Sequence, residues 1–600
     1  MRMFKFLISL LVGGSIAIGA MAIPAKRVIR TVKQPDGTSL TIVYGGDEFL
    51  HYWSTPDGVP VKKRLDGTYA YARISGKQLQ PTLWQAHNAE HRSQSEQHLL
   101  QTISPSAAQL CQLRERKAAS RQASRSVRLS KVRALTQTAS EASPKRKGLV
   151  ILVNFKDVKM AASHTRQAFD DMMNQEGYTG NGNMGSVHDY FLAQSYGQFD
   201  LTFDVVGPVT LSNNLSYYGA NDRYGDDLRP AQMVRDAVAL VQNEVDFSQY
   251  DWDGDGEVDQ VFVICAGHSE AEYPEDDDSG AKYIWPHEWS LGDAGLSVPT
   301  YNGVKVNTYG CSTELGGPNT TKMSGIGTAC HEFSHCLGLP DFYNTDYNGG
   351  FGMDAWSLMD YGSYNGDGYS PVGYTAYERW CCGWLTPQEL TSACTVKEMP
   401  SIAQKPVAYV VYNDGNRNEY FILENRQKDG WLATDEARGM MITHVDYSES
   451  AWYNNTVNNS KSHQRCTIVH ADNDESTYSL AGDLYPNGGL NTELTDESRP
   501  AAKTFNKNAA GHSYLSKPIT GITQTTDGTM SFDFMGGGPV PPTGISEAQT
   551  DGAWNAGTLV KVYSLSGRLL RVAPYANWRN QLPEGVYLLQ SGGQTVKEVR

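Results

Sequence analysis

The sequence lacks the features of several protein classes. Beyond residue 22 no segment approaches the roughly 20 consecutive apolar residues that a membrane-spanning helix needs, so we expect no transmembrane segment. No repeat occurs at the periods of solenoid proteins. Basic residues are outnumbered, 51 against 66 acidic ones, giving a net charge of −15. This balance argues against nucleic acid as a partner, because phosphate binding requires a clustered basic face.

Cysteine is scarce, and its spacing excludes the usual cysteine zinc sites. The chain has 9 cysteines and no CxxC pair. Cys111 stands alone in the early part of the chain, where we expect a spectator thiol. The remaining, even set permits disulfides in an exported protein, although the sequence does not give their pairing. Because Cys330 and Cys336 flank the motif described below, we expect a bridge near that motif.

The first 22 residues have the pattern of a secretory signal peptide. Arg2 and Lys5 form the charged start, residues 6–19 the apolar stretch, and Ala20-Met21-Ala22 the small-residue cleavage site. We therefore expect a protein that is secreted or lies on the outer cell surface.

Changes in composition divide the rest of the chain into five parts. Turn signals between short alternating segments predict a β-rich unit, and the basic, Ser- and Ala-rich stretch after it predicts an exposed, cleavable linker. The apolar run at 149–155 is typical of a strand buried on both faces. The predicted parts are a pro-region with its basic linker (23–147), an α/β (α+β) catalytic domain (148–385), a β-sandwich (386–536), a linker (537–544) and a small β domain (545–600).

Periodicity predicts individual elements within these parts. The predicted helices are 165–174, 187–194 and 229–245, and the predicted strands are 149–155, 261–264, 407–412, 420–424, 440–445 and 530–534.

The segment His331-Glu332-Phe333-Ser334-His335 has the spacing of a catalytic zinc helix. Residues four apart lie on one face of a helix, so both imidazoles can direct a nitrogen at one ion about 2 Å away, with Glu332 beside it as general base. A buried histidine pair satisfied by hydrogen bonds is the structural alternative.

The residues after this helix predict the rest of the zinc site. Gly338 ends the helix in a left-handed turn and Pro340 keeps it ended, which directs Asp341 back to the metal as a third ligand. The fourth position stays open for water, as in catalytic sites. Glu378, on a later helical stretch, is the competing third ligand. Met359 lies in a segment that looks like the Met-turn of metzincin-like peptidases.

This set of residues predicts peptide hydrolysis without a covalent intermediate. Zinc would acidify its water and polarise the carbonyl, and Glu332 would pass the proton of that water to the leaving amine. Tyr361 or Tyr364 could donate to the oxyanion, although tyrosine is so abundant, at 33 copies, that packing competes as an explanation.

A second metal site is predicted in an acidic loop. The first half of an EF-hand pattern is present, but its twelfth position is Phe262 where a glutamate is required. Several inward-pointing carboxylates would repel one another without a hard cation, which favours calcium over an ordinary turn. The candidate ligands are Asp251, Asp253, Asp255, Glu257 and Asp259.

Two other polar groups leave their role open. The six carboxylates from Glu270 to Asp278 are most simply a solvated loop. His444 and Asp446 alternate on a predicted strand and share one face, where they either bind an ion or cap an edge of the sandwich.

Further motifs accompany the zinc helix. They are Ser186-Val187-His188-Asp189-Tyr190-Phe191, Ser195-Tyr196-Gly197, Asp253-Gly254-Asp255-Gly256-Glu257-Val258-Asp259, Ile284-Trp285-Pro286-His287, Cys382-Gly383-Trp384, Glu424-Asn425-Arg426-Gln427, His444-Val445-Asp446 and Gly482-Asp483-Leu484-Tyr485-Pro486. Together with residues 331–341 they resemble the immune inhibitor A family of secreted bacterial metallopeptidases, over a stretch that reaches about residue 535. The resemblance implies a secreted protease with protein or peptide substrates, made as a zymogen, with catalytic zinc and structural calcium.

The last part of the chain looks like a type IX secretion sorting domain of Bacteroidota. The similarity lies in Val560–Tyr563, Ser566-Gly567-Arg568 and Gly585-Val586-Tyr587, and it implies passage through an export machinery and loss of the tail. The main alternative function is a calcium-dependent surface binding or adhesion protein on a protease-like scaffold. A peptidoglycan amidase is a third hypothesis, but its usual ligand sets lack this helix, glycine exit and Met-turn.

Overall fold

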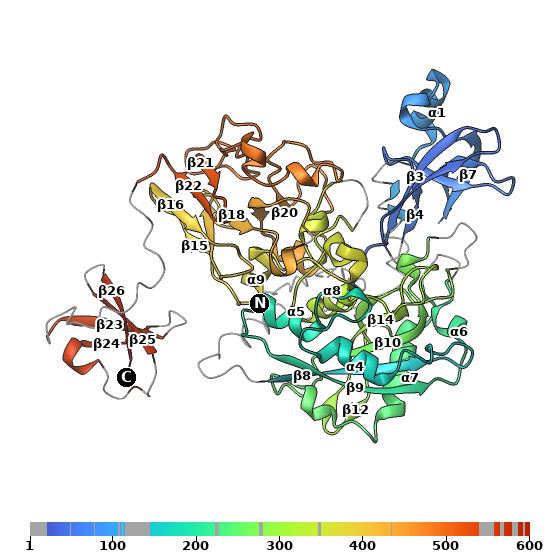
Figure 1. Cartoon of the computed structure of the whole chain (residues 1–600), viewed down its shortest axis with the longest axis horizontal. Coiled ribbons are helices and arrows are strands. Elements are labelled where there is room, and N and C mark those ends of the chain that lie inside the picture. Colours follow the sequence, from blue (N-terminus) through green and yellow to red (C-terminus); the bar gives the residue numbers. More distant parts are fainter. Residues whose placement is uncertain are drawn as a thin grey trace, which may run out of the picture.

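The computed structural model describes residues 21–538 and 557–599. Short segments within these ranges are not described: 48–49, 77, 106–108, 111, 114–144, 223–226, 275–279, 346–349, 434, 565–568, 579–581, 583–585 and 592–593. Within the described ranges, no helix combines the length and apolar character required to cross a membrane. Figure 1 shows the N-terminal sheet (blue) and the β-sandwich (yellow to orange) above a central α/β body, with a small C-terminal sheet (red) standing apart.

The central body is built on a six-stranded mixed sheet in the order β1-β11-β14-β10-β8-β9. Its four neighbouring parallel strands are β9 (Leu201–Thr210), β8 (Arg146–Asn154), β10 (Val261–His268) and β14 (Thr308–Leu315). The antiparallel edge is formed by β11 (His287–Ser290) and the short β1 (Met21–Ala22), which comes from the start of the described chain.

Helices cover both faces of this sheet, which explains the continuous apolar run in β8. Val150 and Leu152 pack with helices α4 (Arg166–Asn174), α5 (Val187–Gln194) and α8 (Ile326–Cys336). Leu149 and Ile151 face the other way, toward α6 (Leu215–Gly219) and α7 (Pro230–Val241). The prediction of a strand buried on both faces is confirmed.

Two predicted boundaries differ from the structure. Strand β8 begins at Arg146, before the predicted domain start at Gly148, because Arg146 and Lys147 already pair with β9. The basic end of the linker is therefore part of the sheet. The predicted helix 229–245 ends at Val241, and Asn243, a residue type that favours caps and turns over helix interiors, follows two positions later.

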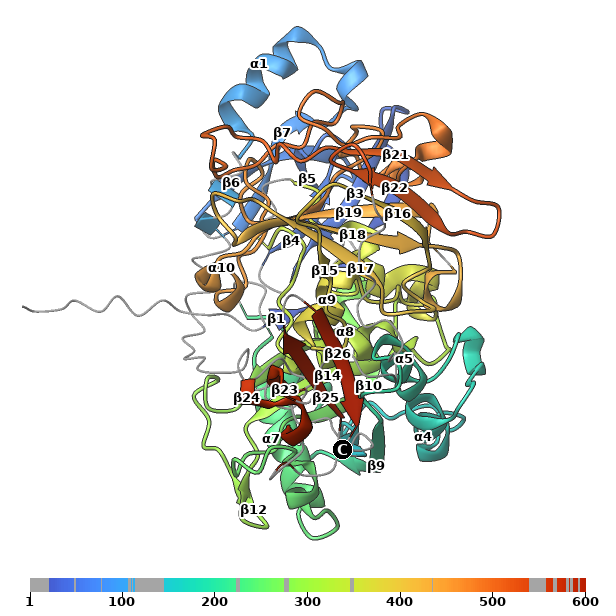
Figure 2. The ribbon, with the colours of Figure 1, turned by 90° about the vertical axis from the view of Figure 1, so that its left-hand side faces the viewer.

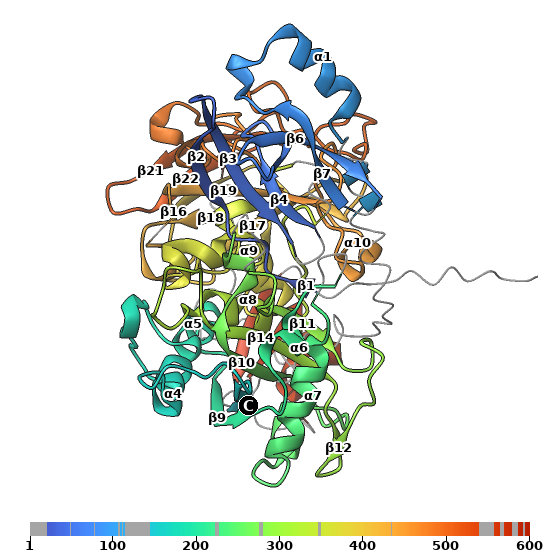
Figure 3. The same cartoon turned by 90° about the vertical axis from the view of Figure 1, so that its right-hand side faces the viewer.

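The N-terminal unit is a six-stranded antiparallel meander in chain order, β2 to β7. Its elements are β2 (Val28–Lys33), β3 (Ser39–Gly46), β4 (His51–Ser54), β5 (Pro60–Lys63), β6 (Tyr69–Ser75), β7 (Gln78–Gln85) and helix α1 (Gln94–Ile103). Seen from the side, this unit stands above the central body, and β1 leads from it down to the central sheet (Figure 3).

The sandwich consists of two sheets, β15-β17-β18-β19-β20 and β16-β22-β21. The strands are β15 (Gln388–Glu389), β16 (Cys394–Met399), β17 (Ala408–Tyr412), β18 (Glu419–Arg426), β19 (Gly439–Asp446), β20 (Cys466–Ile468), β21 (Ile519–Gln524) and β22 (Met530–Phe534). One face of the larger sheet contributes Ile422 and Met441 to the same core cluster as α5 and α8. The sandwich and the central body thus share a core (Figure 2).

The C-terminal unit is a four-stranded sheet in the order β24-β23-β25-β26. Its strands are β23 (Leu559–Ser564), β24 (Leu569–Pro574), β25 (Val586–Ser591) and β26 (Gln594–Val599).

Candidate active site

Helix α8 carries the predicted zinc motif and is wholly buried along it. Its glycine-rich start permits close packing: a Cβ on Gly327 would overlap the carbonyl oxygen of Ser363. The helix ends at Cys336, and Gly338 follows with φ of +90°. Glycine adopts this left-handed backbone readily, so the chain can reverse there and return toward the helix.

Three buried polar atoms converge at this turn without hydrogen-bond partners. They are Nε2 of His331, Nε2 of His335 and Oδ1 of Asp341. Oδ1 of Asp341 lies 3.2 Å from the first nitrogen and 3.5 Å from the second, and all three side chains are fully buried. A buried polar atom without a partner is costly, and two imidazole nitrogens with one carboxylate oxygen are a known zinc ligand set. The residues present therefore fit a zinc ion.

The other polar atoms of these ligand candidates are occupied, which fixes their orientation. Nδ1 of His331 donates to the Leu358 carbonyl and Nδ1 of His335 to the Leu339 carbonyl, each over 2.8 Å. Burial lowers the pKa of His335 to about 4, so this imidazole is neutral at neutral pH and keeps a lone pair on Nε2.

Asn455, from the sandwich part of the chain, holds Asp341. Its Nδ2 donates to Oδ2 of Asp341 over 2.6 Å, and its Oδ1 accepts from the Asp341 backbone N–H over 2.7 Å. Only the unpartnered oxygen of the carboxylate is left facing the histidines. Nothing in the sequence pattern pointed to this residue, which lies 114 positions along the chain from Asp341.

Met359 and Glu378 stabilise the segments next to the predicted zinc ligands. Met359 is fully buried, and its carbonyl accepts from the Phe342 backbone N–H over 2.8 Å, next to Asp341. Glu378 accepts from the Ser357 hydroxyl and the Thr375 backbone N–H, each over 2.6 Å. It caps helix α9 (Ala376–Cys381) and orders the Met359 segment, and both of its oxygens are engaged there.

A peptide bond of the chain itself lies beside the predicted general base. The backbone N–H of Ile23 donates to Oε1 of Glu332 over 3.0 Å. The carbonyl of the preceding Ala22 accepts from the hydroxyl of Tyr343 over 2.6 Å. The Ala22–Ile23 bond thus has its nitrogen at the predicted general base and its oxygen at a hydroxyl donor, as a substrate bond would.

The following residues are held by further contacts with the central body. Trp285 Nε1 donates to the Ile23 carbonyl over 3.0 Å, and the Tyr364 hydroxyl donates to the Pro24 carbonyl over 2.8 Å. The Lys26 backbone N–H donates to the Ala271 carbonyl over 2.8 Å. We call residues 21–27 the N-terminal segment.

Neither predicted oxyanion donor contacts the Ala22 carbonyl. Tyr364 instead contacts the Pro24 carbonyl, and the ring of Tyr361 lies 4.1 Å from the Arg27 guanidinium carbon. Tyr343 instead donates to the Ala22 carbonyl, which is the contact expected of Tyr361 or Tyr364. Tyr343 stands two residues after Asp341, and this closeness to the zinc motif could have marked it in the sequence. Because tyrosine is so abundant in the chain, the position did not stand out.

The acidic loop brings together part of its predicted ligand set. Carboxylate oxygens of Asp251, Asp253 and Asp255 lie within 4.8 Å of one another. Oε1 of Glu257 accepts from Asn307 over 3.1 Å, and Oδ2 of Asp259 accepts from the Trp252 backbone over 2.6 Å. These two side chains therefore have an oxygen committed outside the cluster.

His444 and Asp446 are engaged in hydrogen bonds on the sandwich. His444 contacts Glu419 over 2.9 Å and stacks on Phe421 at 4.3 Å between ring centroids. Asp446 accepts from His463 and Arg465, each over 2.7 Å. Although burial opposes it, the contact with His444 lowers the pKa of Glu419 to about 2.

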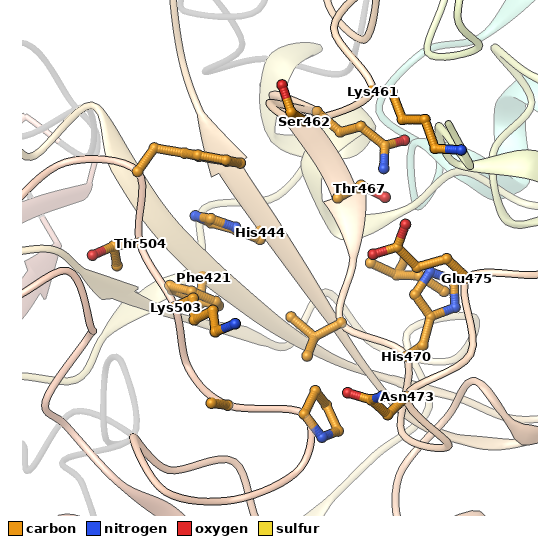
Figure 4. Close-up of a pocket in the computed structure, with 16 residues that line it drawn as sticks. Phe421, His444, Lys461, Ser462, Thr467, His470, Asn473, Glu475, Lys503 and Thr504 are labelled. Atoms are coloured by element: carbon orange, nitrogen blue, oxygen red, sulfur yellow. The ribbon is translucent and has the colours of Figure 1, made fainter. Parts of the chain in front are cut away.

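These contacts border a pocket of about 450 Å³ between the sandwich strands and their loops. Figure 4 shows His444, Phe421 and Lys503 on one side of this pocket and His470, Asn473 and Glu475 on the other.

The disulfide prediction is wrong for the described residues, whose cysteines are all free thiols. Cys330 and Cys336 are six residues apart on one helix, which separates their Cα atoms by about 9 Å, beyond the reach of a disulfide. Cys111 lies outside the described residues.

The sequence of this central body was compared with known proteins. Residues 136–384 match the family described as immune inhibitor A peptidase M6, catalytic domain. This M6-type segment contains the histidine pair, Glu332, Asp341, Tyr343 and Met359. It ends near the start of the sandwich, so the resemblance expected beyond it stays a prediction.

Three curated proteins illustrate the relationship. The pre-pro-metalloprotease PrtV of Vibrio cholerae is 27% identical over 268 residues, which cover 39% of this chain and 29% of that protein. Immune inhibitor A of Bacillus thuringiensis is 29% identical over 217 residues, 31% of this chain and 30% of that protein. A putative secreted metallopeptidase of Arthroderma benhamiae is 21% identical over 227 residues, 33% of this chain and 32% of that protein. The chain thus spans less than a third of the length of these relatives, and the similarity supports a metal-dependent peptidase.

Proposed function

We propose that this chain is a secreted zinc-dependent endopeptidase that is made as a zymogen. The observation that carries this proposal is the coincidence of two features. Three unpartnered ligand atoms converge at the end of α8, and the backbone nitrogen of Ile23, the first residue after the predicted signal-peptide cleavage site, lies on Glu332.

The residues suggest how a peptide bond would be cleaved. His331, His335 and Asp341 would hold zinc, which when bound supplies polarisation of the carbonyl and an acidified water. Glu332 accepts the proton of the attacking water and delivers it to the leaving nitrogen, a position now taken by the Ile23 nitrogen at 3.0 Å. The hydroxyl of Tyr343 donates to the oxygen on which negative charge develops.

The experiment that tests the function is an assay of the chain after cleavage in the linker at 114–147. We expect about one zinc ion per molecule, hydrolysis of casein, and loss of hydrolysis on treatment with a chelator. A pure, zinc-loaded protein that cuts neither casein nor peptides would contradict the proposal and favour the surface-binding alternative.

Replacement of Tyr343 by Phe should lower kcat by about a hundredfold with little change in KM. A hydroxyl donor to the developing oxyanion acts mainly in the transition state, and loss of one such donor typically has an effect of this size. Steady-state kinetics on a peptide substrate measure the split. Tyr250→Phe is the matched control, because its hydroxyl donates to Asp204 of β9 and its ring packs on the other face of the central sheet. An unchanged kcat in Tyr343→Phe would remove this tyrosine from the mechanism.

The contacts of the N-terminal segment would also keep the precursor inactive. From Ile23 onward the N-terminal segment covers Glu332 and occupies the hydrogen-bonding groups beyond it, so a substrate cannot bind them while the segment is in place. The sheet β2–β7 continues directly from this segment, and its release would require cleavage in the basic linker. The small β domain at the C-terminus would serve export, in line with its likeness to sorting domains.

For the acidic loop we propose a structural calcium ion. Calcium should raise the Tm of the protein, because a ligand that binds only the folded state stabilises it by mass action. The double variant Asp253→Ala and Asp255→Ala should abolish this response in a thermal melt, whereas Asp414→Ala, an exposed aspartate of the sandwich, should keep it. A calcium-dependent shift of equal size in the double variant would show that the loop is an ordinary turn.

A further inference from the structure

The N-terminal segment ends in two basic side chains, and both meet carboxylates that belong to the central body. The Arg27 guanidinium contacts Asp354 through both of its terminal nitrogens, Nη2 at 2.9 Å from Oδ2 and Nη1 at 3.4 Å from Oδ1. Lys26 Nζ lies 3.1 Å from Glu272 and 3.3 Å from Asp367. Glu272 belongs to the acidic run that sequence alone assigns to a solvated loop, so for this residue that expectation is wrong.

The Arg27 site is shaped for a guanidinium. The two-nitrogen contact with one carboxylate and the ring of Tyr361, 4.1 Å from the guanidinium carbon, together match the planar fork of arginine. Lysine, with a single ammonium group, cannot reproduce both contacts. At the Lys26 site the partner Asp367 is 80% exposed, which makes that contact the weaker of the two.

The carboxylates of the Arg27 site remain in place when the pro-region leaves. Asp354 is 2% exposed in its side chain, and its backbone N–H donates to the buried Asp360 over 2.9 Å. Asp360 accepts two further backbone N–H groups, whereas Asp354 forms its ion pair, among the described residues, with Arg27. Without Arg27, two acids would stand close together in a largely buried place, an arrangement that attracts a new cation.

The backbone contacts define a register between this site and the cleavage position. Ile23 is the first residue after the bond that lies on Glu332, so Lys26 is the fourth and Arg27 the fifth. The chain between them is fixed by Trp285, Tyr364 and the Ala271 carbonyl, through backbone atoms that any peptide possesses. A substrate held by the same groups would place its fifth residue beside Asp354.

We propose that the mature enzyme selects protein segments with arginine at the fifth position after the cleaved bond, and that a basic residue at the fourth position adds to this preference. The inference rests on the proposed peptidase function and names its substrate class. Asp354 and Tyr361 are then specificity-determining residues, and Glu272 provides a carboxylate for the basic residue at the fourth position.

The test uses the full chain, folded first and then cut in its linker and freed of the N-terminal unit. Two internally quenched peptides contain Met-Ala-Ile-Pro-Ala-Lys-Arg or the same sequence with Gln in place of Arg, and mass spectrometry identifies the cut. We expect kcat/KM to be at least about tenfold higher for the arginine peptide, since a two-nitrogen contact with a buried carboxylate is much stronger than a contact between neutral groups.

The Asp354→Asn enzyme should reduce this ratio to about twofold or less. Asparagine suits the variant because it has the shape of aspartate and tolerates the left-handed backbone of this position, φ +43°. The ratio also cancels any general loss of active enzyme. Glu493→Gln, at an exposed glutamate of the sandwich, is the matched control and should keep the full ratio.

A binding measurement separates failure of this inference from failure of the proposed function. The product peptide Ile-Pro-Ala-Lys-Arg and its Gln twin are titrated into the enzyme by calorimetry. Cleavage of both substrates at equal kcat/KM, with equal binding of both products, would overturn the arginine site and leave the peptidase intact. At least tenfold tighter binding of the arginine product, without any cleavage of peptides or casein, would support the site and contradict the peptidase function.

Discussion

Replacement of Glu332 by Gln should lower the hydrolysis of casein by about a thousandfold or more while leaving zinc bound. Glutamine keeps the shape of the side chain but cannot accept the proton of the attacking water, and general acid–base catalysis contributes up to about 10⁴-fold. The Ile23 nitrogen at 3.0 Å from Oε1 shows that this carboxylate reaches the atom that must be protonated when the bond breaks. Initial rates on casein and metal analysis of the same preparation measure both quantities.

The matched control for this variant is Glu436→Gln, an exposed glutamate of the sandwich part, which should behave as the unmodified enzyme. If Glu332→Gln with a full equivalent of zinc keeps more than a tenth of the activity, Glu332 is not the general base.

Replacement of Asp341 should remove the metal together with activity. Asp341 is fully buried, and its Oδ1 lies 3.2 and 3.5 Å from the two histidine nitrogens, where one ion can contact all three atoms. Asp341→Ala removes this ligand, and Asp341→Asn keeps the volume of the side chain while removing its charge. We expect both variants to lose zinc during dialysis under conditions in which the unmodified enzyme retains it.

Glu378→Gln is the comparison that the sequence suggests, because Glu378 was the competing third ligand. Its two oxygens bind Ser357 and Thr375, so the variant should keep the metal even if the Met359 segment becomes less stable. Zinc content by mass spectrometry decides between the two. Retention of a full equivalent of zinc and near-normal turnover by Asp341→Ala would refute the ligand assignment and the metzincin-like interpretation with it.

Features that depend on neighbours in the sequence were predictable. Two histidines four residues apart fall on one helical face whatever surrounds them, and Gly338 returns the chain toward that face. The apolar runs at β8 and β10 likewise gave strands close to their predicted bounds. In each case the predicted helix or strand is present in the structure, because tertiary packing leaves the locally preferred element unchanged.

Features that depend on distant parts of the chain were not predictable. Asn455 holds Asp341 from another part of the fold, and Ile23 reaches Glu332 across 309 positions of sequence. Nothing in the composition of either segment marks these contacts, since their geometry arises only when the sheets and helices have packed. The expected bridge between Cys330 and Cys336 failed for the opposite reason, because helix geometry within six residues already excludes it.

The pairing of β1 with β11 bears on whether the proposed enzyme would digest folded or unfolded proteins. Met21 and Ala22 add to the edge of the central sheet as an antiparallel strand, opposite Glu288 and His287. Both residues belong to the predicted signal peptide, so its removal frees this sheet edge for an incoming polypeptide, which must offer free backbone N–H and C=O groups in an extended form, as in β-augmentation. Segments already engaged in helices or sheets would first have to unfold locally. Folded domains should therefore resist digestion, and cuts should concentrate in loops, disordered tails and denatured chains.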